Sequence, residues 1–196
     1  MMKILTFVML ITLGFPIQAQ QIQNSSEHLS FKGVPIDGTL SQYVAKMKKA
    51  GFVLTGTDKG IAMMKGEFAG YKDCMIGIST LQQQDLVNKI VVVFSERNDW
   101  SSLSNNYFSL KNLLTEKYGT PEYSIEKFQS YEPKSDGAKM TSVQLGECEY
   151  NSVFDTDKGS IELSIKNNSV TSCYVALAYF DRINSDVMKS TALDDL

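Results

Sequence analysis

The spacing of apolar residues along this chain alternates between a helical period and a strand period. The first helical stripe consists of Leu40, Tyr43, Val44 and Met47. These residues recur at intervals of three and four, which predicts one buried face on a helix. Thr39, with Gln42 three residues later, forms a capping-box pattern at its start. Gly51 stands where a left-handed residue terminates a helix.

Four extended segments follow this helix. They are residues 52–54, 61–68, 74–80 and 88–95. In the third segment, Cys74, Ile76 and Ile78 alternate with more polar or smaller residues, which is the period of a strand with two different faces. The fourth segment contains the β-branched run 90–94 and predicts a strand that is buried on at least one face.

The second half of the chain repeats this plan. The apolar positions of its helix are Leu103, Tyr107, Leu110, Leu114 and Tyr118. Asp99 or Ser101 can cap the start, and Gly119 followed by Pro121 ends the helix. The predicted strands are residues 123–128, 143–154, 160–166 and 172–181. A polar insertion, 130–139, separates the first of them from the second.

The closing strands of the two halves resemble each other in sequence, 92–97 against 177–182, once one position is gapped. We therefore predict an α+β fold of two tandem units, each a helix followed by a four-stranded antiparallel sheet. The units span 31–97 and 98–183, and a C-terminal tail covers 184–196. One helix on a small sheet buries little surface alone, so we expect the two units to pack into one body.

The N-terminus has the pattern of a secretory signal peptide. Lys3 precedes the apolar run 4–15, and 16–19 ends in the small residue Ala19. The run is shorter than the roughly 20 residues of a membrane span, and it lacks the polar face of a buried core helix. We predict a signal peptide over 1–19 and a flexible leader over 20–30.

The predicted location is outside the cytoplasm, either periplasmic or secreted. No second apolar span follows the signal, and no cysteine stands at its end for lipid attachment. The mature chain is therefore expected to be soluble and to carry no membrane anchor. About 175 residues remain after removal of the signal, enough for one ordinary domain.

Charge and motifs argue against several classes of function. The chain has 19 Lys and Arg against 22 Asp and Glu, so it lacks the basic excess that nucleic acids and anionic membranes attract. Its single histidine, His28, lies in the predicted leader, where we expect it to be solvated. Zinc and hydrolase motifs are missing from the sequence. We expect no enzyme, no catalytic residues, no metal and no cofactor.

Three cysteines in an exported chain allow one disulfide and one free thiol. The predicted hairpins place Cys148 opposite residues near 167 and Cys173 opposite residues near 163. These two cysteines would then lie two strands apart, about 9–10 Å, whereas a disulfide needs Cα atoms within about 7 Å. Cys74 could reach either one only if the two sheets join. The geometry favours buried thiols and leaves the disulfide open.

Aromatic residues near loops are candidates for an interface. Trp100 precedes the second helix, where it either packs as a hydrophobic staple, which we favour, or serves as an exposed anchor. Tyr71, Tyr123 and Tyr131 lie in or beside loops and could form a binding rim.

The stretches 31–38 (Phe-Lys-Gly-Val-Pro-Ile-Asp-Gly) and 66–71 (Gly-Glu-Phe-Ala-Gly-Tyr) resemble a group of small exported proteins of gut anaerobic bacteria. The two-unit plan is similar to the fold of the β-lactamase inhibitor protein. That resemblance extends over the mature chain as architecture and implies a concave sheet that grips another protein. It supplies no matched inhibitory residue.

These features together predict an exported, non-enzymatic binding protein. Its partner would be a protein or a component of the cell envelope, contacted by the open sheet face, with the insertion 130–139 as a second contact. The alternative is a carrier that holds an apolar small molecule between helices and sheet. Met47, Met63 and Met64 would suit such an adaptable pocket, or else they belong to the core.

Overall fold

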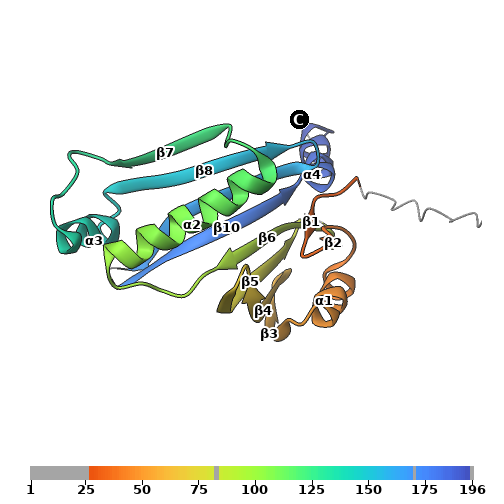
Figure 1. Ribbon diagram of the computed structural model, residues 1–196. Helices are drawn as coiled ribbons and strands as arrows, with labels where there is room; N and C mark the ends of the chain where they lie inside the picture. The colour runs from red at the N-terminus through yellow and green to blue at the C-terminus, as the bar shows by residue number, and fades with distance from the viewer. Residues whose placement is uncertain (1–26, 82–83, 170, 195–196) are drawn as a thin grey trace, which may run out of the picture.

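Eight strands form one antiparallel sheet in the order β3-β4-β5-β6-β10-β9-β8-β7 (Figure 1). The strands are β3 (Val53–Asp58), β4 (Ile61–Phe68), β5 (Tyr71–Thr80), β6 (Val87–Val93), β7 (Tyr123–Phe128), β8 (Cys148–Thr156), β9 (Gly159–Ser169) and β10 (Ser172–Asp181). β1 (Ser30–Phe31) and β2 (Val34–Pro35) form a separate two-stranded hairpin.

The structure is a computed structural model that describes residues 27–81, 84–169 and 171–194. The predicted signal peptide, 1–19, and most of the predicted leader lie outside the described residues. Among the described residues, the helices are all too short or too polar to cross a membrane.

The α+β class is confirmed, but the predicted division into two separate four-stranded sheets is not matched. The last strands of the two halves, β6 and β10, pair with each other and merge the two sets into one sheet. β6 contains four valines and an isoleucine, and β10 is mostly apolar; each would present unpaired backbone groups if it remained an edge. Pairing them removes two exposed sheet edges and satisfies those groups.

Two helices lie where the sequence predicted none. α3 (Asp136–Gln144) occupies part of the insertion and continues into the predicted strand 143–154, so β8 begins only at Cys148. Its apolar pattern is short because Met140 and Val143 are its buried residues. α4 (Arg182–Asp194) spans the described part of the C-terminal tail. Helices of this length are marginal in isolation, so tertiary packing decides whether they form.

The two predicted helices are confirmed. α1 (Leu40–Lys49) begins with the Thr39–Gln42 capping box, and Gly51 follows it at φ +95°. α2 (Trp100–Tyr118) begins at Asp99, whose side chain accepts a hydrogen bond from the Ser102 amide at 2.7 Å. The buried stripes of both helices join one core with the strands. In Figure 1, α2 crosses β8 and β10, while α1 lies beside β3, β4 and β5.

The start of α2 has a second cap that comes from α3. The carboxylate of Asp136 accepts hydrogen bonds from the amides of Trp100 (3.1 Å) and Ser101 (2.8 Å) and from the Ser101 hydroxyl. The hydroxyl bond, with the amide bonds and Lys139, lowers the pKa of Asp136 below its usual value. A carboxylate at a helix N-terminus accepts hydrogen bonds from the free backbone N–H groups there. Because Asp136 belongs to α3, the same bonds fix α3 against the start of α2.

Strand register divides the sheet into two faces. One row of directly opposed residues crosses the whole sheet; it contains Met63, Gly77, Val91, Ala178, Glu162, Val153 and Tyr123. Opposed residues of an antiparallel sheet share a face. Their neighbours Ile90 and Val92 are fully buried under the helices. The row therefore marks the opposite face, which we call the open face.

Gly159, at the start of β9, packs closely against the backbone of β10. Its φ is +146°, and a Cβ atom there would lie 2.0 Å from the Phe180 carbonyl oxygen. We expect Gly159→Ala to lower the free energy of unfolding by more than about 2 kcal/mol, because backbone must move. Urea denaturation measures this. Gly137→Ala in α3 is the control, since no atom lies within 4 Å of its added Cβ; equal losses would contradict the expectation.

Candidate functional site

The open face has a hollow at the seam where β6, β10 and β9 run side by side. Its volume is about 440 Å³. The floor consists of Val91 and Val93 from β6 and Ala176 and Ala178 from β10, and the two pairs stand directly opposite each other. Small alanine side chains beside valines leave room above the sheet. The hollow is thus a product of residue size at the central strands.

Longer side chains surround this floor. Phe180 lies at one end and Tyr174 at the other, and both line the hollow. The ammonium of Lys89 lies 4.7 Å from the centre of the Phe180 ring, a cation–π contact. Glu162 and Lys166 extend from β9. Within the described part of the chain, Lys89, Glu162 and Lys166 form no ion pair, so their charges face the hollow and solvent.

The open face also carries apolar side chains outside the hollow. On the β3–β4 side, Val53 is 66% exposed, Ile61 43% and Met63 36%. Register places all three on the same face as the hollow. On the other side, the same face carries Tyr123, Ile125 and Val153 as well as Asn151 and Ser164. Val53, Ile61 and Met63 add exposed apolar surface to the open face beside the hollow.

The structure separates the four predicted interface residues. Tyr123 is 49% exposed and lies on the open face, in the same row as Ala178. Tyr131 is 76% exposed and follows β7, away from the hollow. Tyr71 is partly buried, with its ring 5.1 Å from Phe94. Of the three tyrosines, Tyr123 alone shares a surface with the hollow.

Trp100 is a core residue and supplies no exposed anchor. It is 8% exposed, and its ring lies 5.1 Å from Tyr150 and 5.3 Å from Phe128. These partners come from β8 and β7, so Trp100 packs against the sheet. Its position inside α2, at the first helical residue, explains the difference from a staple.

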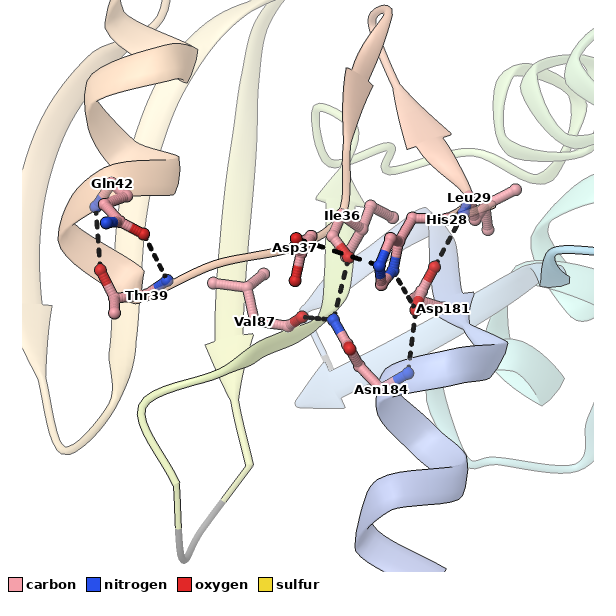
Figure 2. A network of polar contacts seen from close by, with 9 residues as sticks. All are labelled: His28, Leu29, Ile36, Asp37, Thr39, Gln42, Val87, Asp181 and Asn184. Carbon is pink, nitrogen blue, oxygen red and sulfur yellow. Dashed lines mark hydrogen bonds and ion pairs between the residues drawn. The ribbon is translucent and has the colours of Figure 1, made fainter. Parts of the chain in front are cut away.

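A buried polar cluster, which we call the clasp, joins the N-terminal segment to the end of β10 (Figure 2). Asp181 is fully buried; it accepts hydrogen bonds from the amides of Leu29 (2.7 Å) and Asn184 (3.0 Å). His28 Nδ1 lies 2.9 Å from the same carboxylate, and its Nε2 lies 3.9 Å from Asp37. His28 was expected to be solvated, and this expectation is wrong: its side chain is only 20% exposed.

Asn184 completes the clasp from α4. Its side-chain nitrogen Nδ2 donates hydrogen bonds to the carbonyl oxygens of Ile36 (3.1 Å) and Val87 (2.8 Å). One side chain thus connects the second half of the chain with the N-terminal segment and with β6 of the first half. The side chains of Asp181 and Asn184 form hydrogen bonds to backbone N–H and C=O groups. Such bonds are typical of a cluster with a structural role.

The three cysteines are free thiols. Cys148 and Cys173 lie on β8 and β10, which are separated by β9, so the expected two-strand separation holds. One detail differs: Cys173 stands opposite Asn167 and not near residue 163. Cys74 lies on β5 and is separated from β10 by β6. Burial, with a smaller contribution from Cys173, raises the pKa of Cys148 to about 11.

Metal binding has no support from the side chains that the structure places, since no three His, Cys, Asp or Glu residues among them converge. Comparison with protein-family models, curated proteins and solved structures finds no match for this chain.

Sequence reasoning predicted the open face as a surface but missed the hollow in it. The available signal was the alternation of Ala176 and Ala178 with the large residues Val175, Leu177 and Tyr179 in one strand. That pattern indicates small residues on one face. It could not show that β6, with two valines on the same face, would lie beside them.

Removal of the Asn184 side-chain amide tests the clasp. Asn184→Ala leaves two buried carbonyl oxygens without this donor, so we expect the free energy of unfolding to fall by about 2–4 kcal/mol. Chemical denaturation followed by circular dichroism measures it. Asp186→Ala, an exposed position on the same helix, should change stability by less than about 0.5 kcal/mol. A loss no larger than that of the control would refute a structural role for the cluster.

The raised pKa of Cys148 predicts slow alkylation. A thiol with a pKa near 11 is almost wholly protonated at pH 8, and the thiolate is the reacting species. We expect iodoacetamide to modify Cys148 at pH 8 at least about tenfold more slowly than an unstructured cysteine peptide. The rate should rise with pH up to about pH 11, as peptide mass mapping can follow. Rapid labelling at pH 8 in the folded protein would show that the thiol is not shielded.

Proposed function

We propose that this chain is a non-catalytic binding protein whose open sheet face contacts a protein or a component of the cell envelope. The observation that carries the proposal is the combination of a 440 Å³ hollow and exposed apolar side chains on one face of the sheet. The helices α1 and α2 bury the other face. Burial of apolar surface is the main source of affinity in association, and this face offers it.

The proposal includes export. The pattern of residues 1–19 supports removal of a signal peptide and action outside the cytoplasm. The absence of an enzymatic role is likewise part of the proposal. This part of the proposal is supported by the clasp, where the side chains of Asp181 and Asn184 form hydrogen bonds to backbone groups and so have a structural role.

The order of the strands supports an origin from two tandem units. The order β3-β4-β5-β6 continues as β10-β9-β8-β7, which reverses the second set. The seam register pairs Val92 with Leu177, the first residues of the two similar segments 92–97 and 177–182. On either side of this pair, Val91 meets Ala178 and Val93 meets Ala176. The pairing of equivalent residues at the seam supports an origin from two tandem units.

The carrier alternative has less support. Met47 and Met64 are fully buried in the common core and so fill space between helices and sheet. Met63 is exposed on the open face. A carrier of an apolar small molecule therefore stays a prediction from composition, and no observation in the described helix-to-sheet layer favours it.

Substitution in the floor of the hollow tests the proposed surface. Ala178→Arg places a long charged side chain where the partner would sit, while Ala178 itself lies outside the core layer. Immobilised mature chain should retain one or more proteins or envelope components from a native envelope extract. We expect Ala178→Arg to reduce that retention at least tenfold, as quantitative mass spectrometry can measure.

The matched control is Ser109→Arg, on the exposed side of α2. It adds the same charge to the opposite side of the molecule and should leave retention unchanged. Circular dichroism confirms that both variants are folded. If the wild type and Ala178→Arg retain the same components in the same amounts, the open face is not the contact surface and the proposed function is wrong.

A further inference from the structure

We infer that the hollow receives an extended segment of a partner protein with two apolar side chains between two carboxylates, all on one face of that segment. This inference rests on the proposed function and specifies the partner for the same surface. It follows from three properties of the hollow: an apolar floor, cationic ends and the distance between those ends.

The floor selects apolar side chains. Two valines and two alanines, Val91, Val93, Ala176 and Ala178, form an apolar block at the seam. Two rows of opposed residues make up this block, and the rows are spaced two residues apart along each strand. Two successive same-face side chains of an extended segment have that same spacing, about 6.8 Å. One apolar side chain can therefore sit over each row.

The ends of the hollow select carboxylates. Lys89 lines one end beside Phe180, and Lys166 lines the other beside Tyr174. Neither lysine has an ion-pair partner within the ranges that the structure describes. A carboxylate brought to each end would give each lysine the ion-pair partner that it lacks among the described residues. Such complementarity contributes to specificity and association rate.

The separation of the lysines sets the length of the segment. Register places Lys89 opposite Phe180, and Lys166 opposite Tyr174, six residues away on β10. With standard strand spacings, the two Cα atoms are about 22 Å apart across two strands and six residues. An extended chain covers this length in about six residues. The carboxylates therefore belong at positions one and seven, and the apolar side chains at three and five.

Glu162 disfavours an acidic residue in the middle of the partner segment. Glu162 lines the hollow and stands opposite Ala178, a register position between those of the two lysines. An acidic residue in the middle of the segment would meet this like charge, which disfavours it. A lipid headgroup carries its charge at one point and does not match two cations separated by an apolar floor and an anion. The pattern of charge thus favours a peptide segment over an anionic lipid.

A displayed library of random heptapeptides is the probe for this inference. The library is selected on the wild-type chain alone, so that binding to Ala178→Arg remains a result of the experiment and not a criterion of the selection. We expect enrichment of sequences with Asp or Glu at positions one and seven and apolar residues at three and five. Enriched peptides are then synthesised, and their dissociation constants are measured by fluorescence anisotropy.

The variants separate the contributions of the hollow. Ala178→Arg should weaken binding at least tenfold, and Lys89→Gln and Lys166→Gln at least threefold each, with a smaller loss at high salt. Lys127→Gln on β7 is the matched control, since this exposed lysine lies outside the hollow, and should have no effect. Glu162→Gln should preserve binding and relax the selection against acidic residues in the middle.

The outcomes distinguish this inference from the proposed function. Peptides that depend on Ala178 but show no acidic preference and no response to Lys89 or Lys166 would overturn the inference and leave the open face as the contact surface. Enriched peptides that bind Ala178→Arg equally well would count against both. If no peptide is enriched while phosphatidylglycerol vesicles bind in a lysine-dependent manner, the occupant is a lipid and the inference is wrong.

Discussion

The antiparallel pairing of β6 with β10 is the contact on which the rest of this structure depends. It joins two four-stranded sets by backbone hydrogen bonds at strands that would otherwise be edges. Because the pairing brings Val91 and Val93 beside Ala176 and Ala178, it also creates the floor of the hollow. On the opposite face, it aligns Val92 with Leu177 and makes one core out of two.

The clasp works at one end of this same seam. Asp181 ends β10 and caps α4, and its carboxylate holds the Leu29 amide of the N-terminal segment. Asn184 reaches the Val87 carbonyl at the start of β6. The end of each seam strand is therefore fixed by a buried polar group. A buried carboxylate and amide with several hydrogen bonds favour one arrangement over others, because any slip leaves a polar group without a partner.

Local patterns sufficed for some elements and failed for others, for identifiable reasons. α1 and α2 have long stripes and strong caps at Thr39 and Asp99, so their ends were predictable. α3 has two buried apolar residues, and part of its stabilisation comes from the contact of Asp136 with another helix, which no local pattern contains. His28 looked solvated because its partner Asp181 is 153 residues away in sequence.

The sequence by itself determined the α+β class, the two main helices and the alternation of each strand between two faces. These depend on periodicity and capping, which act within a few residues. Only the tertiary structure decided that the two sets of strands form one sheet, that Trp100 is buried and that Tyr123 shares a face with the hollow. Those outcomes depend on which strand edges meet, and edge pairing is chosen by the whole chain's burial and hydrogen bonding.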